Sequence, residues 1–390
     1  SSIYLTAPVP ISNQPWYHNA VIAVETSLSA HDLLQTLHQI EADFGRVRSV
    51  QNAPRVIDID VLDYNGTVSS LKELELPHPR MVDRAFVLFP LSEIAPAWCH
   101  PVTGISIDDY IAALSTDQSI KRDNSPEIMG IINVTPDSFS DGGAFYNPDK
   151  AIEHGLRLID EGARYLDIGG ESTRPNAISI APEEELRRIL PVIRGLKNCG
   201  AVLSVDTFHA STMAVALKEN IGMINDITAL EGDAKSISVL KDSDCQICLM
   251  HMQGTPSTMQ NNPVYKDVVA DVVAYLERRV AFCETNGIAR NRLVVDPGIG
   301  FGKNLAHSIE LLRNLSAFHV LPVPILLGAS RKSFIAKIMG RDVPASDRLG
   351  GSLAAVAAAV QHNIDIVRVH DVQETRQFLD VYTQICCVSS

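Results

Sequence analysis

The sequence has no excess of basic residues and no apolar stretch long enough to cross a bilayer. Its 33 Lys and Arg residues are outnumbered by 46 Asp and Glu residues, giving a formal net charge of −13. This balance argues against a general nucleic-acid-binding surface. The longest apolar block near the C-terminal end, 353–360, is far shorter than the roughly 20 residues of a membrane-spanning helix. The sequence therefore indicates neither a nucleic-acid-binding protein nor a membrane protein.

The cysteines also lack the even, closely spaced pattern of a disulfide framework. There are seven of them in 390 residues, an odd number in a long chain. Cys245 and Cys248 lie in a predicted strand, where a spacing of three directs the two side chains to opposite faces. Because no second Cys pair accompanies them, we expect buried or incidental thiols rather than a metal or redox site.

The sequence begins at Ser1 without an initiator Met or a signal-like apolar segment. We therefore expect a cytoplasmic protein whose natural chain begins before Ser1. A hydrophobic share of 46% with 20% charged residues is typical of a globular protein. A length of 390 residues suits a large domain with a smaller neighbour.

Residues 129–143 read MGIINVTPDSFSDGG, a short apolar run that stops at Asn133 and continues into a polar loop. This pattern predicts a buried strand that carries a polar side chain at its C-terminal end. Seven further apolar runs end in the same way, with helix-length segments between them. The polar residues or turns at their ends are Gly169, Asp206, Asn225, His251, Asp296, Gly328 and Arg368 to His370. Eight alternating strand and helix units predict an α/β fold, a closed (β/α)8 TIM barrel with its site at the strand C-termini.

These segments resemble dihydropteroate synthase from about residue 128 to residue 390. The motifs that carry the resemblance are MGIINVTPDSFSDGG, DIGGESTRP, VDT, IND, LMHMQGTP, DPGIGFGKN, LLGASRKSFI and IVRVHDV, in this order. The resemblance implies an enzyme that condenses a pterin pyrophosphate with p-aminobenzoate and releases pyrophosphate. It also implies sensitivity to sulfonamides and a dissociative step, in which pyrophosphate departs before the amine attacks.

Several residues match the family's site by motif. The implied catalytic residues of the barrel are Asp206, Lys332, Arg368 and His370. The implied pterin site comprises Asp206, Asn225, Met250, Asp296, Gly328 and Lys332. The implied p-aminobenzoate site comprises Thr173, Arg174, Pro175, Phe301 and Ser333, with residues 135–147 as a second closing loop. The implied pyrophosphate site comprises Asn133, Arg368 and His370, with Asn133 also a ligand of Mg²⁺.

The chemistry of these residues supports the implied roles, but each residue type can also have a purely structural role. Asp206, Asn225 and Asp296 can bind the hydrogen-bonding edge of an aminopyrimidinone ring, or they can cap the helices that follow them. Arg368 and His370 share a strand face and can hold phosphate oxygens, or Arg368 can form a salt bridge at the rim. The Gly298 to Gly302 segment can approach a flat ligand, or it can be a turn without a ligand. We expect the pyrophosphate clamp to lie apart from a deeper pterin slot.

The N-terminal part predicts a helix over 31–44 with Ser29 as its N-cap. It also predicts a strand at 54–62 that places Asp58 and Asp60 on one face. Two adjacent carboxylates suit Mg²⁺ with nucleotide phosphates, although an Asp-x-Asp sequence alone more often marks a solvated face. The basic residues nearby favour the metal site, and they are Arg46, Arg48, Arg55, His78 and Arg84.

This part resembles hydroxymethyldihydropterin pyrophosphokinase over about 1–105. The resemblance rests on SSIYLTAPV, QPWYHNAVIAVETSL, GRVR, APRVIDIDVLDYNG and LPHPRMVDRAFVLFPLSEIAP. It implies Mg²⁺ bound by Asp58 and Asp60, and ATP as a substrate, with Arg55 also catalytic. The implied ATP-binding residues are Arg46, Arg48, Arg55, His78 and Arg84. The implied pterin-binding residues of the kinase are Thr6, Val9, Tyr17, Asn19 and Phe86.

The resemblance implies a ferredoxin-like α+β domain at 1–111, a linker at 112–127 and the barrel at 128–390. The family's opening strand, Gly-containing turn and first helix are absent from this sequence, so we do not expect 1–111 to fold well alone. Asn52 stands where the family often has an aromatic residue. Competing interpretations are a pterin-binding methyl-transfer barrel and a pterin-binding barrel with a non-catalytic N-terminal scaffold. The Ala-rich helix at 352–361 can mediate a homodimer or be buried within one chain.

Overall fold

The structure, a computed structural model, describes residues 1–6, 17–45, 57–71, 73–114, 120–122, 125–135, 147–172 and 180–386. The chain divides into two compact units, Ser1–Asp123 and Asn124–Cys386. Each unit has its own sheets and core, and each is described here by itself.

The N-terminal unit has small antiparallel sheets and three helices among its described residues, as expected for an α+β domain. One sheet has the order β2-β1-β5 and another pairs β3 with β4. Its strands are β1 (Tyr4–Thr6), β2 (Tyr17–Asn19), β3 (Ser69–Leu71), β4 (Leu74–Leu76) and β5 (Ile120–Arg122). Its helices are α1 (Ala30–Asp43), α2 (Ala85–Ile94) and α3 (Ile107–Ala112). The range predicted as a linker, 112–127, thus contains β5 and the first residue of the next strand.

Two local predictions for this unit have different outcomes. Helix α1 begins after Ser29, whose side chain accepts a hydrogen bond from the Asp32 backbone N–H, so the predicted helix and N-cap are confirmed. The strand predicted at 54–62 is wrong for the described residues 57–62, which are assigned to no strand. The Ile59 backbone N–H donates instead to the buried Glu41 carboxylate at 2.8 Å. The side chains still alternate between exposed and partly buried positions: Asp58 and Asp60 are exposed, and Ile57, Ile59 and Val61 are partly buried.

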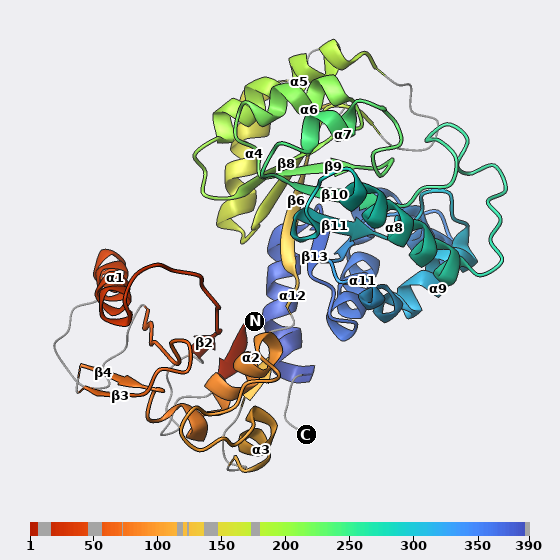
Figure 1. Cartoon of the computed structure of the whole chain (residues 1–390). Coiled ribbons are helices and arrows are strands. Elements are labelled where there is room, and N and C mark those ends of the chain that lie inside the picture. The colour runs from red at the N-terminus through yellow and green to blue at the C-terminus, as the bar shows by residue number, and fades with distance from the viewer. Residues whose placement is uncertain are drawn as a thin grey trace. The chain divides into compact units, whose positions relative to one another are not determined.

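The C-terminal unit is a parallel barrel with its helices outside the strands (Figure 1). The eight strands found in the described part of this unit are β6 (Glu127–Asn133), β7 (Tyr165–Gly169), β8 (Val202–Asp206), β9 (Met223–Asp226), β10 (Gln246–Met250), β11 (Leu293–Asp296), β12 (Leu326–Leu327) and β13 (Ile366–Val369). Hydrogen bonds connect them in the order β11-β10-β9-β8-β7-β6-β13-β12. A bridge between Val295 and Ile325 joins β11 to the start of β12 and closes the ring. The predicted (β/α)8 barrel is confirmed.

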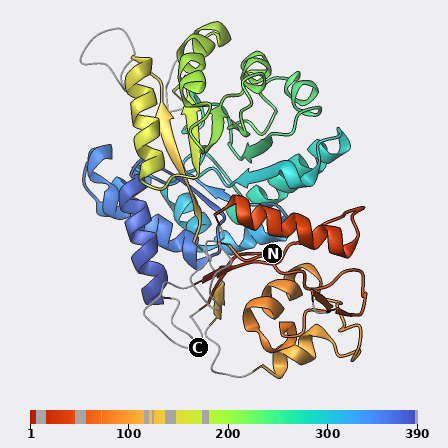
Figure 2. The ribbon, with the colours of Figure 1, turned by 90° about the vertical axis from the view of Figure 1, so that its left-hand side faces the viewer.

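One outer helix follows each barrel strand along the chain, except that β12 is followed by two (Figure 2). They are α4 (Pro148–Asp160), α5 (Pro182–Leu196), α6 (Ala210–Leu217), α7 (Ser236–Leu240), α8 (Val268–Thr285), α9 (Leu305–Arg313), α10 (Ser333–Met339), α11 (Leu349–Gln361) and α12 (Val372–Cys386). Helix α11 buries Ala355, Val356 and Ala359 within the unit, which accounts for part of the Ala-rich face without a second chain.

The two faces of the barrel strands bury different clusters. Outward-facing residues such as Ile132, Leu166 and Val205 belong to the large core shared with the helices. A second cluster fills the N-terminal half of the barrel interior, and it consists of Met129, Tyr165, Met223, Cys248, Val294, Leu326 and Ile366. Side chains alternate along a strand, so the residues two places further along each strand face the interior nearer the C-terminal ends. Those residues are mostly polar, and they form the site described next.

The alternation also explains the paired cysteines. Cys245 packs in the cluster between strands and helices, and Cys248 packs in the barrel interior. Both are buried, so the prediction that the two side chains lie on opposite faces is confirmed.

Candidate functional site

A layer of polar side chains fills the C-terminal half of the barrel interior. Its centre is Asp167 on β7, which is fully buried. Asp167 Oδ1 accepts from Ser204 Oγ at 2.6 Å, and Oδ2 accepts from Asn225 Nδ2 at 3.0 Å. Oδ2 also accepts from Arg368 Nε at 2.5 Å. The four residues come from β7, β8, β9 and β13, so one carboxylate connects strands far apart in the sequence.

Arg368 forms a second ion pair in this layer. Its Nη2 lies 3.0 Å from Asp206 Oδ2. Burial raises the pKa of Asp206 to about 7; Arg368 opposes this shift, and the neighbouring Asp167 adds to it. Burial acts to lower the pKa of Arg368, but Asp167 and Asp206 raise it above its ordinary value. The guanidinium therefore stays charged while Asp206 can titrate near neutral pH.

Asp296 and Lys332 form a second polar pair across the barrel mouth. A Cβ on Gly328 would lie 3.5 Å from Asp296 Oδ2 and 3.9 Å from Lys332 Nζ, so both groups approach the backbone there. Burial raises the pKa of Asp296, while Lys332 opposes the shift. Burial also lowers the pKa of Lys332 to about 8, against the attraction of Asp296. In both cases burial disfavours the charged form and the opposite charge of the partner favours it.

The loop after β11 is held by its backbone carbonyl groups. Lys332 Nζ donates to the Ile299 carbonyl at 2.5 Å, Gln260 Nε2 to Gly300 at 2.7 Å and Tyr265 Oη to Gly302 at 2.6 Å. Lys332 Nζ also lies 4.6 Å from the centre of the Phe301 ring. Donors from two other parts of the barrel, the segment after β10 and the loop after β12, therefore fix the position of this loop and of the Phe301 ring.

Gly298 and Lys303 bracket the same loop. Gly298 has a φ of +68°, and a Cβ there would lie 2.0 Å from the His251 carbonyl oxygen. The buried Lys303 Nζ is 2.8 Å from His251 Nδ1 and donates to the Phe301 carbonyl at 2.9 Å. Burial lowers the pKa of Lys303 well below its ordinary value and lowers the pKa of His251 to about 3. This pair joins the segment after β10 to the loop after β11, which supports a positioning role.

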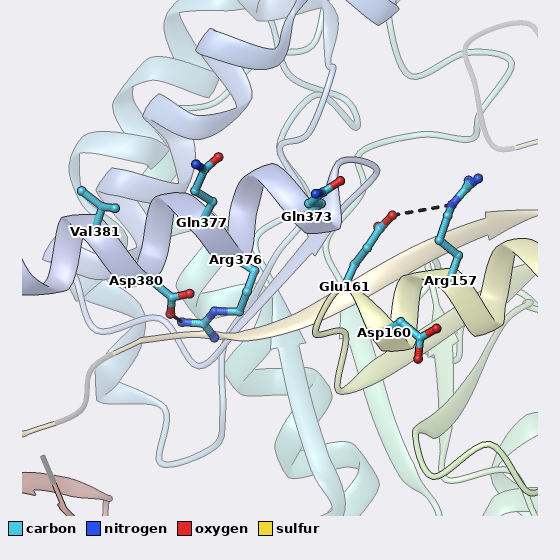
Figure 3. A pocket seen from close by; sticks show the side chains of 8 residues that line it. All are labelled: Arg157, Asp160, Glu161, Gln373, Arg376, Gln377, Asp380 and Val381. Carbon is cyan, nitrogen blue, oxygen red and sulfur yellow. Dashed lines mark hydrogen bonds and ion pairs between the residues drawn. The ribbon is translucent and has the colours of Figure 1, made fainter. Parts of the chain in front are cut away.

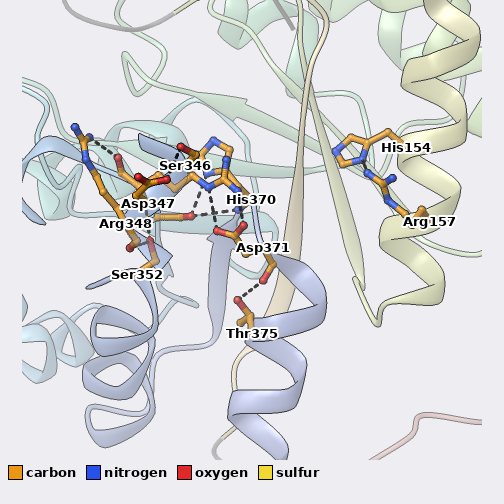
Figure 4. A network of polar contacts seen from close by, with 11 residues as sticks. His154, Arg157, Ser346, Asp347, Arg348, Ser352, His370, Asp371 and Thr375 are labelled. Atoms are coloured by element: carbon orange, nitrogen blue, oxygen red, sulfur yellow. Dashed lines mark hydrogen bonds and ion pairs between the residues drawn. The ribbon is translucent and has the colours of Figure 1, made fainter. Parts of the chain in front are cut away.

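The loop from Ser330 to Lys332 is anchored to the end of β13. Ser330 Oγ is 3.0 Å from His370 Nδ1, and Arg331 forms two hydrogen bonds to Asp371. The Arg331 backbone N–H donates to Ser352 Oγ at 2.9 Å. Figure 4 shows Ser352, His370 and Asp371 in this network. These contacts fix the backbone that presents Lys332.

A separate groove of about 580 Å³ lies on the outside of the barrel (Figure 3). Its lining comes from the end of α4 and from α12, and it includes the Arg157–Glu161 and Arg376–Asp380 ion pairs. No residue of the polar interior layer contributes to it.

The N-terminal unit holds a cluster of charged side chains around Asp60. Its Oδ2 is 3.8 Å from His78 Nε2. Burial lowers the pKa of His78; Asp60 raises it, and Arg84 adds to the lowering. Burial also lowers the pKa of Arg84, with Asp58 and Asp60 opposing. Arg84 lies 5.3 Å from the centre of the Phe86 ring, and Asn19 Nδ2 donates to Thr6 Oγ1 at 2.9 Å.

Sequence and structure comparisons agree on what this chain resembles. The family described as "Pterin binding enzyme" matches residues 129–370, and "7,8-dihydro-6-hydroxymethylpterin-pyrophosphokinase (HPPK)" matches residues 1–96. The first match covers more than half of the chain and includes every strand that contributes to the polar layer. The chain belongs to the pterin binding enzyme family.

Individual relatives extend this likeness beyond the barrel. The folic acid synthesis protein of Pneumocystis carinii is 37% identical over 96% of this chain and 54% of its own length. The mitochondrial folate synthesis bifunctional protein of Arabidopsis thaliana is 36% identical over 96% of this chain and 74% of its own. A dihydropteroate synthase of Xanthomonas albilineans with 4-aminobenzoic acid is 44% identical, with a TM-score of 0.64 over 69% of this chain and 96% of that one. The chain spans about half the length of the fungal relative.

Within this pterin binding enzyme barrel, the structure brings several predicted residues together. Arg368 contacts Asp206 directly, and Asp296 influences the pKa of Lys332. Asp206, Asn225 and Asp296 are not the N-caps of α6, α7 and α9; those are His209, Lys235 and Asn304. The capping alternative is therefore wrong for all three.

The separation expected between the clamp and the pterin slot is wrong for Arg368. Its ion pairs join it to Asp167 and Asp206 in the interior layer, because its long side chain reaches inward toward these buried carboxylates. His370 instead lies beside Ser330. Met250 is buried, Phe301 partly buried and Ser333 exposed.

Some predicted residues lie outside the described part of the chain. They are Val9, Arg46, Arg48, Asn52, Arg55, Thr173, Arg174 and Pro175. Most of the closing loop predicted at 135–147 lies there as well.

Sequence reasoning missed Asp167, Ser204 and the Lys303–His251 pair. It looked for polar residues at the ends of apolar runs, whereas Asp167 is inside one. A usable signal existed, because a charged side chain within a fully buried strand requires a partner of opposite charge.

Two findings concern only the described residues. In that part of the chain, no helix has the length and apolar character needed to cross a membrane. The same residues contain no cluster of three or more His, Cys, Asp or Glu side chains suited to a metal ion.

Proposed function

We propose that this chain catalyses two consecutive steps of folate biosynthesis. The N-terminal unit transfers pyrophosphate from ATP to 6-hydroxymethyl-7,8-dihydropterin. The barrel then condenses the pterin pyrophosphate with p-aminobenzoate, forming 7,8-dihydropteroate and releasing pyrophosphate. Family membership of both segments supports this assignment.

The observation that carries the barrel assignment is the polar interior layer. Asp206, Asn225 and Asp296 present hydrogen-bond acceptors from three strands, which suits the N–H groups of an aminopyrimidinone ring. Arg368 and Lys332 place positive charge in the same partly dry space, which suits a pyrophosphate leaving group. The two requirements of the reaction therefore meet in one site.

The same residues account for a dissociative reaction. As the bond from the pterin carbon to the pyrophosphate oxygen breaks, negative charge increases on the departing group, and Arg368, Lys332 and His370 stabilise it. The ring acceptors hold the cationic pterin in place until the amine of p-aminobenzoate attacks. The Xanthomonas albilineans relative, seen with 4-aminobenzoic acid, supports this choice of amine.

The proposed kinase site centres on Asp58 and Asp60, with His78 and Arg84 beside them. Two exposed carboxylates fit Mg²⁺, because this ion favours one or two carboxylates together with phosphate oxygens over an all-protein cage. When bound, Mg²⁺ would neutralise the charge of the ATP phosphates. Arg84 contributes a further positive charge, and Thr6 and Asn19 are proposed to orient the pterin.

Two other functions are less well supported. A pterin-dependent methyl-transfer barrel would share the ring acceptors, but it would have no use for Arg368 and Lys332 as partners of pyrophosphate. A non-catalytic N-terminal scaffold would have no use for paired aspartates beside His78. We also propose small-molecule substrates only, a cytoplasmic location, and a homodimer through the barrel.

A coupled assay tests the proposal. The chain is incubated with pterin pyrophosphate and p-aminobenzoate, and dihydropteroate and pyrophosphate are both quantified. Equal amounts of the two products, suppressed by a sulfonamide, would support the barrel reaction. Product from hydroxymethyldihydropterin and ATP in place of pterin pyrophosphate would support the kinase reaction. Methyl transfer without pyrophosphate release would contradict the assignment.

A further inference from the structure

We propose that Asp167 is a positioning residue that sets the hydrogen-bond polarity of the barrel pocket, and thereby its preference for a ring with a 2-amino group. This inference rests on the proposed pterin site. Asp167 is the first residue of the DIGGESTRP motif, but the family resemblance assigned it no role, and the inference gives it a measurable effect on ligand choice.

Among the described residues, the three that form hydrogen bonds with Asp167 are all donors. Arg368 Nε, Asn225 Nδ2 and Ser204 Oγ all point to its two oxygens, at 2.5, 3.0 and 2.6 Å. Asp167 is fully buried, so these groups take the place of water as its hydrogen-bond partners. A carboxylate in such a position accepts on every side, so each neighbour must direct a hydrogen toward it.

This requirement fixes the orientation of the Asn225 amide. Asparagine has a donor and an acceptor that are nearly equal in shape, and only its partners decide which way each points. Because Nδ2 is bound to Asp167, Oδ1 points away from it. Asn225 therefore adds an acceptor to those of Asp206 and Asp296, and the opposite orientation would present a donor.

Asp167 fixes Arg368 by the same bond. The Nε–H is bound to Asp167 and Nη2 is bound to Asp206, so the plane of the guanidinium is set by two carboxylates. The pocket then presents an acceptor-rich surface beside one oriented cation. A 2-amino-4-oxopteridine matches this arrangement, whereas a 2-oxo ring places an acceptor where a donor is required.

The test compares two ligands on the full chain, a 2-amino-4-oxopteridine and the corresponding 2,4-dioxopteridine. Calorimetry gives the ratio of their dissociation constants. We expect the unsubstituted protein to favour the 2-amino ring, and Asp167→Asn to reduce this preference by roughly tenfold or more, the factor expected for one reversed buried hydrogen bond. The matched control is Asp160→Asn, the same chemical change at an exposed position on α4, which should leave the ratio unchanged.

A swapped variant separates positioning from general stability. Asp167→Asn combined with Asn225→Asp keeps the charge of the layer, and a carboxylate at position 225 offers an acceptor whichever way it turns. We expect this pair to regain the 2-amino preference. An unchanged ratio in Asp167→Asn, or an equal loss of both ligands in it, would overturn the positioning role. If that variant does not fold, the swapped pair alone decides: retained preference supports the inference and lost preference overturns it.

The failure of the proposed function has a different signature. If the unsubstituted protein binds neither ring, the pterin site itself is wrong. If it binds the 2-amino ring and the variants keep the same ratio, only the role of Asp167 is wrong.

Discussion

Asp206 lies on the inner face of β8 with one oxygen 3.0 Å from Arg368. Asp206→Asn keeps the size of the side chain but replaces one acceptor with a donor. We expect pterin binding to weaken by about 2–4 kcal/mol, because a buried charged hydrogen bond is lost and a donor is left opposed. Calorimetry with a pterin ligand measures the loss. Asp160→Asn, the same chemical change at an exposed position on α4, is the control, and equal effects of the two would remove Asp206 from the site.

The charges of Asp206 and Lys332 predict the pH dependence of the barrel reaction. The raised pKa of Asp206, about 7, means that its charged form is lost as the pH falls below that value. The lowered pKa of Lys332, about 8, means that its cation is lost as the pH rises above that value. We expect kcat/KM to be highest between these values and to fall on both sides.

Lys332→Arg tests the alkaline side of this profile. Arginine remains charged far above pH 8, so the alkaline fall should move to higher pH while the acid fall stays near 7. A profile that is unchanged in the variant would assign the alkaline fall to another group.

Arg368→Lys tests whether geometry or charge alone is required. Lysine keeps the positive charge but cannot bond both Asp167 and Asp206 through one planar group. We expect slower turnover and weaker pyrophosphate binding, each by roughly 1–3 kcal/mol. Because Arg368 contacts Asp206, pterin binding without pyrophosphate should weaken as well. Binding of bare pterin at full strength would show that the ion pair with Asp206 does not order the ring site.

At the scale of elements, the loop after β11 depends on close approach of the backbone. Gly298 and Gly340 have nearly the same left-handed φ, +68° and +65°. A Cβ on Gly298 would meet the His251 carbonyl oxygen at 2.0 Å, whereas among the described residues no heavy atom beyond the two chain neighbours lies within 4 Å of a Cβ on Gly340. The two positions therefore separate steric clash from backbone strain.

We expect Gly340→Ala to lower the free energy of unfolding by about 1–2 kcal/mol, the cost of a left-handed side-chain residue. Gly298→Ala should lower it by a further 1–3 kcal/mol or more, because β10 and the loop must also move apart. Denaturant unfolding of both variants measures the difference. Equal losses of unfolding free energy in the two variants would mean that the loop after β11 accommodates the added methyl group without a further cost in stability.

At the scale of the whole molecule, the two proposed activities reside in separate compact units. Asp58→Asn removes one of the paired carboxylates in the N-terminal unit. We expect it to abolish pyrophosphate transfer from ATP while dihydropteroate formation from preformed pterin pyrophosphate continues at its normal rate. Measuring both reactions on the same preparation provides the internal control. Equal loss of both would indicate that Asp58 supports the structure rather than a metal ion.

Much of the barrel follows from local sequence patterns. Short apolar runs with helix-length segments between them specify strands and helices, and parallel strands place their C-terminal ends on one side. This is why Asp206, Asn225 and Asp296 could be placed near one another from the sequence. The N-cap at Ser29 was predictable for the same reason, since capping depends on the next three residues.

The strand predicted at 54–62 did not form over its described residues, and the reason is physical. The extended segment around Asp60 has the alternation of a strand, but a strand also requires a partner, and the buried Glu41 takes the Ile59 N–H instead. Alternation is a property of neighbouring residues, whereas pairing is decided by segments elsewhere in the chain.

By itself, the sequence determined the strand and helix pattern, the barrel and the side of it that carries polar groups. Only the tertiary structure decided which of those groups act together. Asp167 and Arg368 are 201 residues apart in the chain, and they meet because β13 lies next to β6, which in turn pairs with β7. Burial then makes their partnership necessary, since a charge removed from water must find an opposite charge or a hydrogen bond. That requirement depends on closure of the whole barrel, and no short stretch of sequence contains it.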